Sequence, residues 1–349
     1  MNLASLTTLR VGGPIGSLVE AGTEAELVDA VRAADADGTP LLVLGGGSNL
    51  LVGDRGFDGV VVRDTRADVS LANHGSCGGL EITATAGTPW DALVAQAVGS
   101  QWSGFEALSG IPGSTGATPI QNVGAYGAEV ADIIALIRTW DREDGALRSL
   151  PLVKAQFGYR DSMLKRTMTD GPWGPTPRYV VLDVTFHTRM ASLSAPVRYQ
   201  QLATALGVEL GARVPIVDVR AAVLELRSSK GMVLDPADHD TWSAGSFFTN
   251  PIVPAGSLPE GAPAYPVAGE GMVKTSAAWL IERAGFSRGF AAAPDAAASL
   301  STKHTLALTN RGGASAADIV ALARAVRDGV RERFGITLVP EPVTVGVEI

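Results

Sequence analysis

The feature that most constrains this chain is the glycine-rich stretch 103–127, SGFEALSGIPGSTGATPIQNVGAYG. It holds too many glycine, proline and small polar residues for a core helix or strand, although Ile111, Ile120 and Val123 are expected to be buried anchors. Its glycines allow left-handed backbone conformations and close approach to a ligand; they are Gly110, Gly113, Gly116, Gly124 and Gly127. Because peptide N–H groups in such a loop can point at anionic oxygens, the stretch predicts a binding loop for a phosphate-bearing cofactor.

A second stretch of the same character, LGGGSNLLV, covers residues 44–52. The dinucleotide fingerprint fails here because Leu50 stands where the third glycine is needed. A Walker A loop fails as well, because it needs Gly-Lys-Ser or Gly-Lys-Thr where this chain has Ser48-Asn49. What remains is a phosphate-binding turn between apolar strands at 41–44 and 60–62, in a non-Rossmann setting. For either loop alone, a surface loop with turn glycines is the favoured interpretation. Two such loops together indicate a large phosphate-bearing cofactor.

Composition excludes several classes of protein. With 349 residues the chain is expected to form two or three domains. The net charge of −8 and the absence of a basic stripe argue against a nucleic-acid partner. Cys77 is the single cysteine and no histidine lies four residues from another, so neither a disulfide framework nor a metal centre is expected. No signal peptide and no apolar run of about 18 residues is visible, which predicts a soluble cytoplasmic protein without a membrane partner.

Capping signals place several helices. Thr23 with Glu26 predicts a helix that ends at Gly38, and Ser315 with Asp318 predicts one that ends at Gly335. Thr88 followed by Pro89 predicts a helix whose core face holds Trp90, Leu93, Val94 and Ala97. Apolar patterns predict further helices at 217–226 and 276–284, and strands at 80–84, 133–140, 179–186, 305–308 and within 336–349. The predicted segments are 1–66, 67–225, 226–335 and 336–349.

Three short motifs after the long glycine-rich stretch could carry chemistry. GYRDS places Arg160 beside a flexible glycine, where it could clamp a carboxylate, although a surface ion pair with Asp161 is the simpler interpretation. AGSFFTNP holds Ser246 between a glycine and two phenylalanines, as an ordinary turn serine would be. LVPEP holds Glu341 between prolines, and glutamates at strand ends are common.

Taken in order, these motifs are specific. LGGGSNLLV, GIPGSTGATPIQNVGAYG, GYRDS, AGSFFTNP, KTSAAWLIERAG and LVPEP follow one another over nearly the whole chain. In this the chain resembles the MurB family, the UDP-N-acetylenolpyruvoylglucosamine reductases of peptidoglycan precursor synthesis. It is similar to the longer variety, which has an extra substrate-covering loop. The resemblance implies an α+β fold. That fold has a two-part FAD-binding region of the vanillyl-alcohol oxidase (PCMH-like) type, a C-terminal α+β substrate-binding domain, and a last segment that returns to the FAD-binding region with Glu341.

The resemblance also implies a reaction. NADPH reduces FAD and leaves, and reduced FAD passes a hydride to UDP-N-acetylglucosamine enolpyruvate, giving UDP-N-acetylmuramate. Negative charge then develops on an enolate-like species, which demands preorganised positive or hydrogen-bonding groups. Arg160 and Glu341 match the residues that stabilise this charge. Ser246 matches the serine that gives the final proton to carbon.

Binding residues follow from the same resemblance. Tyr126, Tyr199, Lys230, Asn250 and His304 match substrate contacts, Tyr199 and Lys230 at the diphosphate. Many relatives of this fold bind FAD covalently through a histidine in the first glycine loop, where this chain has Ser48 or Asn49, so non-covalent FAD is predicted. The expected FAD contacts are Gly45, Gly46, Gly47, Ser48, Asn49, Gly110, Ile111, Pro112, Gly113, Ser114, Thr115, Gly116, Gln121, Asn122, Gly124, Ala125 and Tyr126. A monomer is expected, with the UDP-sugar and NADPH as its small-molecule partners.

Two alternatives stay open at this point. Another flavin oxidoreductase of the same fold, acting on a hydroxy acid or a sugar, would explain both glycine loops but not the set Arg160, Ser246 and Glu341. A non-catalytic flavin- or nucleotide-binding module would bind FAD without turning over NADPH. The fold alone does not separate these possibilities, because function depends on the site.

Overall fold

The computed structural model describes residues 1–73, 79–267 and 269–349, which form two compact units. The larger unit comprises Ile15–Gly47 and Asp58–Val233. The smaller unit comprises Met1–Pro14, Ser48–Phe57 and Leu234–Ile349. Cys77 and His74 lie outside the described residues. The segment boundaries predicted from the sequence, at 66, 225 and 335, stay predictions.

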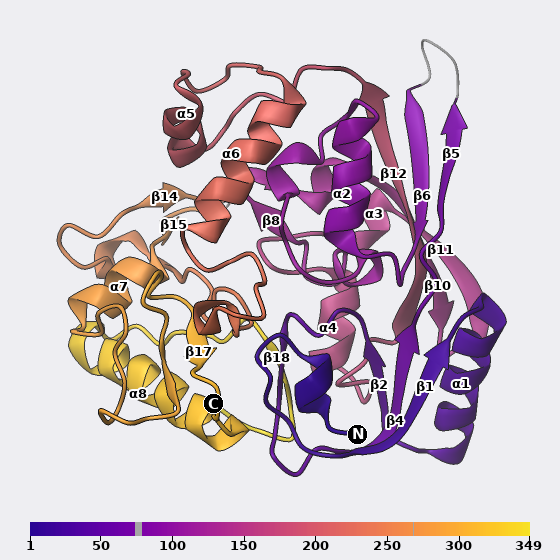
Figure 1. Ribbon diagram of the computed structural model, residues 1–349, viewed down its shortest axis with the longest axis horizontal. Coiled ribbons are helices and arrows are strands. Elements are labelled where there is room, and N and C mark those ends of the chain that lie inside the picture. Colours follow the sequence, from indigo (N-terminus) through magenta and orange to yellow (C-terminus); the bar gives the residue numbers. More distant parts are fainter. Residues whose placement is uncertain (74–78, 268) are drawn as a thin grey trace. The chain divides into compact units, whose positions relative to one another are not determined.

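The first sheet of the larger unit has the strand order β1 (Ile15–Ala21), β4 (Phe57–Asp64), β2 (Leu41–Leu44). β2 pairs in parallel with β4, with Leu41 opposite Val60. Helix α1 (Glu24–Asp37) lies beside this sheet (Figure 1) and packs Leu27 and Val31 into a core with Val62. The predicted capping box of α1 is confirmed, and Gly38 ends the helix with a φ of 66°.

The second sheet of the larger unit is antiparallel. Its strand order is β11 (Ala146–Pro151), β10 (Ile134–Asp141), β12 (Tyr179–Met190), β6 (Leu80–Thr85), β5 (Val69–Asn73), and β7 (Trp102–Ser103) pairs with β12. The strands predicted at 80–84, 133–140 and 179–186 are therefore confirmed, the last one extended. The alternating apolar residues of these strands line a core with the buried side chains of helix α2 (Trp90–Gly99).

Helix α2 buries Trp90, Leu93, Val94 and Ala97 as predicted. Its start differs from the prediction, because Pro89 itself is the N-cap and no side chain caps the helix. The Thr88 hydroxyl lies 3.0 Å from that of Thr85 instead. The other elements of the larger unit are η2 (Glu106–Leu108), η3 (Thr115–Ala117), β8 (Gly124–Ala125), β9 (Ala128–Glu129), η4 (Val130–Asp132), α3 (Leu152–Ala155), α4 (Met163–Thr169), α5 (Gln200–Leu206) and α6 (Ile216–Ser228). α6 confirms the helix predicted at 217–226.

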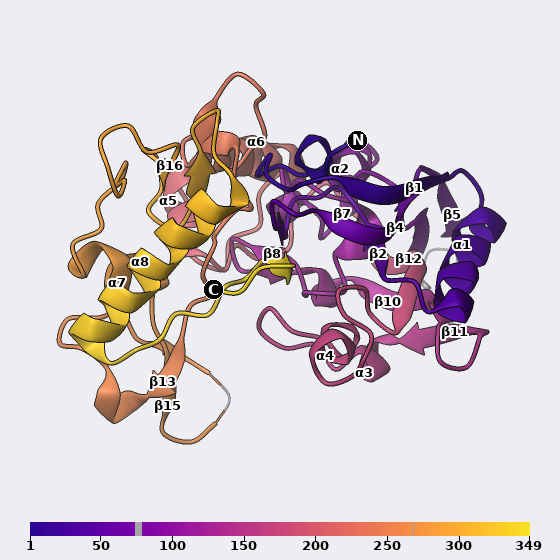
Figure 2. The ribbon, with the colours of Figure 1, turned by 90° about the horizontal axis from the view of Figure 1, so that it is seen from below.

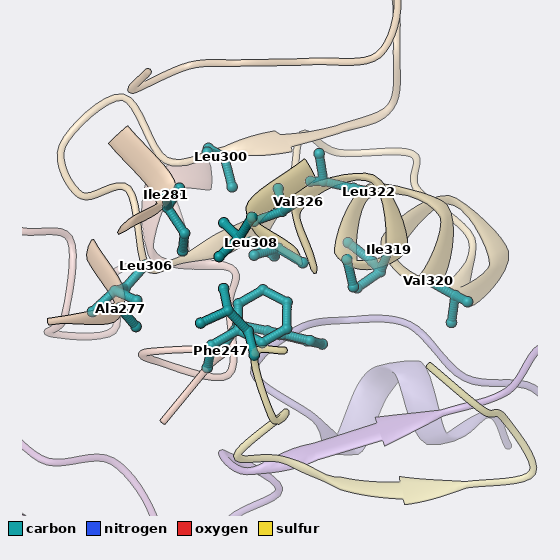
Figure 3. Packing of buried hydrophobic residues seen from close by; sticks show 14 of the residues in the cluster. Phe247, Ala277, Ile281, Leu300, Leu306, Leu308, Ile319, Val320, Leu322 and Val326 are labelled. Atoms are coloured by element: carbon teal, nitrogen blue, oxygen red, sulfur yellow. The ribbon is translucent and has the colours of Figure 1, made fainter. Parts of the chain in front are cut away.

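The smaller unit is built around two helices, α7 (Ala277–Arg283) and α8 (Ala316–Phe334), which lie against each other (Figure 2). Apolar residues of both helices meet Phe247 and Leu308 in one core (Figure 3). α8 has the predicted capping box of Ser315 and Asp318, and Gly335 ends it. The other elements are η1 (Leu3–Leu6), β3 (Leu50–Val52), η5 (His239–Thr241), β13 (Ile252–Pro254), η6 (Ala255–Ser257), β14 (Tyr265–Pro266), β15 (Met272–Lys274), β16 (Ala298–Leu300), β17 (Leu308–Asn310) and β18 (Val343–Val345).

Two strand predictions in the smaller unit need correction. The strand predicted at 305–308 is wrong. Residues 304–307 form a turn in which the Ala307 N–H donates to the His304 carbonyl, so β17 begins only at Leu308. The segment 336–349 contains only the short β18, because Pro340 and Pro342 cannot donate to a strand ladder. β18 pairs in parallel with β3, and Val343 lies opposite Leu50.

Within the described residues, no helix is both long enough and apolar enough to cross a membrane.

Candidate cofactor and substrate site

The glycines of the long loop meet two different structural needs. Gly110, Gly113 and Gly127 adopt positive φ angles of 71°, 125° and 83°, as predicted. Gly116 and Gly124 do not, and close packing is what requires glycine there: a Cβ on Gly116 would lie 2.4 Å from the Ala86 Cβ. The predicted apolar anchors are only partly buried, because this loop covers the core rather than entering it; they are Ile111, Ile120 and Val123.

The two glycine loops meet inside the larger unit. A Cβ on Gly46 would lie 2.5 Å from the Gly113 Cα, and a Cβ on Gly45 would lie 2.5 Å from the Ser114 Oγ. Gly45 and Ser114 also line a cavity of about 70 Å³. A binding site for a large cofactor needs two backbone segments that approach each other this closely. A side chain at either glycine would collide with the other loop and force the two loops apart.

Several expected cofactor contacts have their backbone groups engaged by the protein. The N–H groups of Thr115 and Gly116 donate to the carbonyls of Thr88 and Ala86, at 2.8 and 2.9 Å. These two groups therefore fix the loop. Pro112 and Gln121 lie in the same loop, and Gln121 is buried.

Ser48 and Asn49 belong to the smaller unit, at the start of β3. The Asn49 carbonyl accepts from the Val343 N–H at 3.0 Å, and the Asn49 side-chain amide lies 3.5 Å from the Glu341 carbonyl. The end of the first glycine loop is thereby tied to the segment that carries Glu341.

Arg160 is positioned by the long loop. Its guanidinium donates to the carbonyl of Gly124 at 2.8 Å and to that of Asn122 at 3.4 Å. Asp161 forms an ion pair with Arg166. The Asn122 side chain donates to the Glu129 carboxylate at 2.7 Å and to the Gly158 carbonyl at 3.0 Å, which joins the long loop to the GYRDS motif.

Three predicted substrate residues come together in the larger unit. The rings of Tyr126 and Tyr199 meet edge to face with 5.7 Å between centroids. The Lys230 Nζ lies 5.6 Å from the centroid of the Tyr126 ring and donates to the Gln201 side chain at 2.7 Å. Tyr126 also lines a cavity of about 510 Å³. Burial raises the pKa of Tyr126; burial, together with the charge of Arg227, lowers the pKa of Lys230.

Arg227 was not singled out by the sequence. It lies on α6, and its Cδ would be 3.5 Å from a Cβ on Gly110. The spacing of Arg227 and Lys230, three residues apart at the end of a helix, is the one signal that could have found it.

Ser246 and Glu341 lie on neighbouring segments of the smaller unit. The Glu341 N–H donates to the Phe247 carbonyl at 2.8 Å, and Phe248 forms an antiparallel bridge with Pro340. Both residues are partly buried, and Phe247 anchors their segment in the core. The structure thus brings two of the three predicted catalytic residues together, while Arg160 is described in the larger unit.

Asn250 and His304 are also in the smaller unit. The Asn250 side-chain oxygen accepts from the Ala277 N–H at 2.9 Å, at the start of α7. His304 lies in the turn before β17, where its backbone N–H donates to the Ser301 hydroxyl at 3.3 Å. Within the described residues, no group of three or more histidine, cysteine or acidic side chains could hold a metal ion.

Comparison with known proteins agrees with this arrangement. Residues 16–150 match the model of an FAD binding domain, and residues 235–345 match that of the UDP-N-acetylenolpyruvoylglucosamine reductase C-terminal domain. The chain is 57% identical to the reductase of that name from Cutibacterium acnes, over 99% of this chain and 90% of the relative, and 56% identical to that from Nocardia farcinica, over 100% and 90%.

A solved structure covers the whole length as well. It is the crystal structure of UDP-N-acetylenolpyruvylglucosamine reductase (MurB) from Thermus caldophilus, with a TM-score of 0.64, 26% identity, and 99% of this chain and 97% of that chain covered. The expected α+β fold with an FAD-binding region is therefore confirmed. The chain belongs to the UDP-N-acetylenolpyruvoylglucosamine reductase (MurB) family.

Proposed function

We propose that this chain reduces UDP-N-acetylglucosamine enolpyruvate to UDP-N-acetylmuramate, with NADPH as reductant and non-covalent FAD as cofactor. The family supplies the reaction, an oxidoreductase step of peptidoglycan precursor synthesis. The observation that carries the proposal at the site is the contact between the two glycine loops, at Gly46 and Gly113. The two loops can keep this arrangement around a cofactor only while positions 46 and 113 are both glycine.

The residues present fit FAD. The loops around Gly45–Asn49 and Gly110–Gly116, with Gln121, Asn122 and Tyr126, would hold it. Ser48 and Asn49 offer no histidine for a covalent link, which supports non-covalent binding. When bound, FAD accepts electrons from NADPH and supplies a hydride to the enol ether of the substrate.

Three side chains would then stabilise the negative charge of the enolate-like species and supply its proton. Arg160 would face the substrate carboxylate with its fixed guanidinium fork and stabilise the enolate-like charge. Glu341, in its protonated form, would share that charge. Ser246 would deliver its hydroxyl proton to the adjacent carbon, because an enolate is basic enough to take it when the geometry is fixed. The contacts that join the segments of Ser246 and Glu341 support a common role for these two residues.

Substrate binding would use the cluster around Tyr126. Tyr199 and Lys230 would hold the diphosphate, with Tyr126 beside them, and Asn250 and His304 would contact other polar groups of the substrate. The contacts of Tyr126 with Tyr199 and Lys230 support the first part of this assignment. We further propose that the protein acts in the cytoplasm as a monomer.

An anaerobic two-step titration of the purified protein tests the reaction. NADPH is expected to bleach the absorbance of oxidised FAD, and UDP-N-acetylglucosamine enolpyruvate is expected to restore it. Bleaching without recovery would indicate another flavin oxidoreductase. If purified protein held no flavin and took up none when FAD was added, the cofactor assignment itself would be wrong.

A further inference from the structure

The carboxylate of Asp91 joins three elements of the larger unit. It lies in the first turn of α2, where an acidic side chain favours the helix dipole. Its Oδ1 also accepts from the Gly110 N–H at 2.6 Å, and its two oxygens accept from the two terminal nitrogens of Arg220 at 2.7 and 2.9 Å. The helix dipole requires neither of these bonds, which tie the long loop to α6.

The bond to Gly110 holds the long loop where its proposed FAD contacts begin. Gly110 has a φ of 71° and is the first of those contacts in this loop. Two residues earlier, the Leu108 carbonyl accepts from the Trp90 indole N–H at 3.1 Å. Two neighbouring side chains of α2 therefore fix the same turn of the loop. Without Asp91, the Gly110 N–H would lose a charged acceptor, and such bonds are stronger than neutral ones.

The bond to Arg220 fixes α6 over the same turn. The helix packs closely there, since a Cβ on Gly110 would lie 2.8 Å from the Leu224 Cδ2. Lys230 follows this helix, and its Nζ lies 5.6 Å from the ring centroid of Tyr126, near the end of the long loop. A shift of α6 against the loop would therefore change the position of Lys230 relative to Tyr126.

Asp91 keeps its charge at neutral pH. Burial alone would raise the pKa of Asp91, but the hydrogen bonds from Arg220 and Gly110 outweigh it, so the pKa lies below its ordinary value. The ion pair is only partly shielded, with the Arg220 side chain 18% exposed and the Asp91 side chain 38% exposed. Its bidentate geometry restricts the orientation of both side chains, which suits a role in positioning.

We propose that Asp91 is a positioning residue that sets the long loop and α6 relative to each other. Through the Gly110 N–H it holds the loop for FAD, and through Arg220 it holds α6 for the substrate. This rests on the proposed function, which places FAD at the loop and the substrate diphosphate at Lys230. Neither Asp91 nor Arg220 is among the proposed FAD or substrate contacts, so both act through other residues.

Three variants separate the two bonds. Asp91→Ala removes both, Asp91→Asn keeps an oxygen for the Gly110 N–H without the charge, and Arg220→Met removes only the ion pair. Dissociation of FAD from the holoprotein is measured by flavin fluorescence on dilution. Asp91→Ala is expected to weaken FAD binding by about ten- to hundredfold, the range for a hydrogen bond to a charged group. Asp91→Asn should recover most of this loss, and Arg220→Met should bind FAD as the parent protein does.

The substrate side is measured in anaerobic single-turnover reoxidation of the reduced holoprotein by the enolpyruvyl substrate. Arg220→Met is expected to raise the substrate concentration for half-maximal rate by about two- to fivefold, the range for a partly exposed ion pair, with the maximal rate near that of the parent. Asp91→Asn should raise it similarly, and the double variant should raise it no further than Arg220→Met, because both changes break one interaction. Asp29→Asn is the matched control, since it breaks an exposed ion pair with Arg32 on α1 and should change neither quantity.

The outcomes separate this inference from the proposed function. If the parent protein holds no FAD, or the substrate does not reoxidise its reduced FAD, the proposed function fails and this inference fails with it. If the parent does both and the variants match it in FAD affinity and in half-saturation, the inference alone is overturned, even where their melting temperatures fall. Should Asp91→Ala not fold, Asp91→Asn and Arg220→Met decide. Equal loss of FAD affinity in those two variants would contradict the division between the two bonds.

Discussion

Asn122, Tyr126 and Arg160 hold backbone conformations that residues with side chains rarely adopt. Their φ angles are 45°, 50° and 54°, in the left-handed region where each residue other than glycine loses on the order of 1 kcal/mol. Arg160 is compensated by the hydrogen bonds from its guanidinium to the long loop, and Asn122 by its bonds to Glu129 and Gly158. Strained residues persist where the surroundings over-determine them, which is frequent at functional sites.

These left-handed residues also show how much of the site the sequence can predict at the residue scale. Glycine positions and motif order predict the two loops, because glycine has a local conformational meaning. Nothing local in Tyr126 or Arg160 predicts a left-handed backbone, since both residue types disfavour it. The sequence did not single out Arg227 for another reason: within the described residues its Nε has no hydrogen-bond partner, and this property of packing has no sequence pattern.

Gly46→Ala is expected to abolish FAD binding. The new Cβ would lie 2.5 Å from the Gly113 Cα, a backbone atom that cannot move aside cheaply, so one of the two loops must shift. Flavin content after purification in excess FAD measures the effect. Gly99→Ala is the control, because nothing lies within 4 Å of its Cβ; that change should leave flavin content intact and raise stability by about 0.5–1 kcal/mol at the end of α2. Full flavin content in Gly46→Ala would contradict the loop assignment.

Ser246→Ala is expected to separate the two half-reactions. NADPH should still reduce FAD at the parent rate, whereas reoxidation by the enolpyruvyl substrate should slow by at least about a hundredfold, the lower range for loss of a general acid. Anaerobic stopped-flow absorbance measures both steps. Thr249→Val is a matched control on the same segment, since the Thr249 hydroxyl donates to the Val339 carbonyl at 3.3 Å, away from the proposed proton transfer. Equal reoxidation rates in Ser246→Ala and in the parent protein would remove Ser246 from the proton transfer.

At the scale of elements, capping motifs predicted helix ends more reliably than apolar runs predicted strands. Both capping boxes predicted helices whose ends the structure confirms, because the bonds that define a cap lie within four residues. The strand predicted at 305–308 was wrong, since an apolar run does not say whether its backbone pairs or turns. The prolines around Glu341 shortened the last strand and left this carboxylate on an irregular segment next to Phe247.

Ser315→Ala is expected to lower the free energy of unfolding by about 1 kcal/mol. Ser315 accepts from the Asp318 N–H at 3.2 Å and begins α8, the helix that supplies much of the core of the smaller unit. Urea unfolding of the parent and variant proteins measures the difference. Ser315→Gly should lose only a few tenths of a kcal/mol, because glycine is tolerated at this position. An equal loss in both variants would show that the hydroxyl is not what matters.

At the scale of the whole molecule, the chain passes repeatedly between its two units. The smaller unit takes three separate ranges, and the larger unit takes two. The sequence predicted consecutive segments, because local patterns report neighbours along the chain. The pairing of β3 with β18 joins residues almost 300 positions apart, and neither strand carries a signal for the other.

Acid should destabilise both units. Burial alone would raise the pKa of Asp141, but hydrogen bonds and charge from Arg178 outweigh it, so its pKa lies below the ordinary value; a hydrogen bond from Lys303 lowers that of Asp238. A lowered folded-state pKa gives stability that is present at neutral pH and lost as pH falls below about 4. Melting temperatures from pH 6 to pH 3 should therefore decline, and Asp141→Asn should start lower and decline less. The exposed Asp58→Asn should follow the parent curve; a matching curve for Asp141→Asn would contradict this account.

The pairing of β18 with β3 has a consequence for how the protein is made. Residues 15–47 and 58–233 are complete well before β18 is synthesised, so the larger unit can fold while the ribosome is still at work. β3 must wait, without its partner strand, until Val343–Val345 have left the exit tunnel. Glu341 belongs to the same late segment. A chain stalled shortly before this point would therefore carry a folded larger unit but would lack Glu341, the residue proposed to share the enolate-like charge.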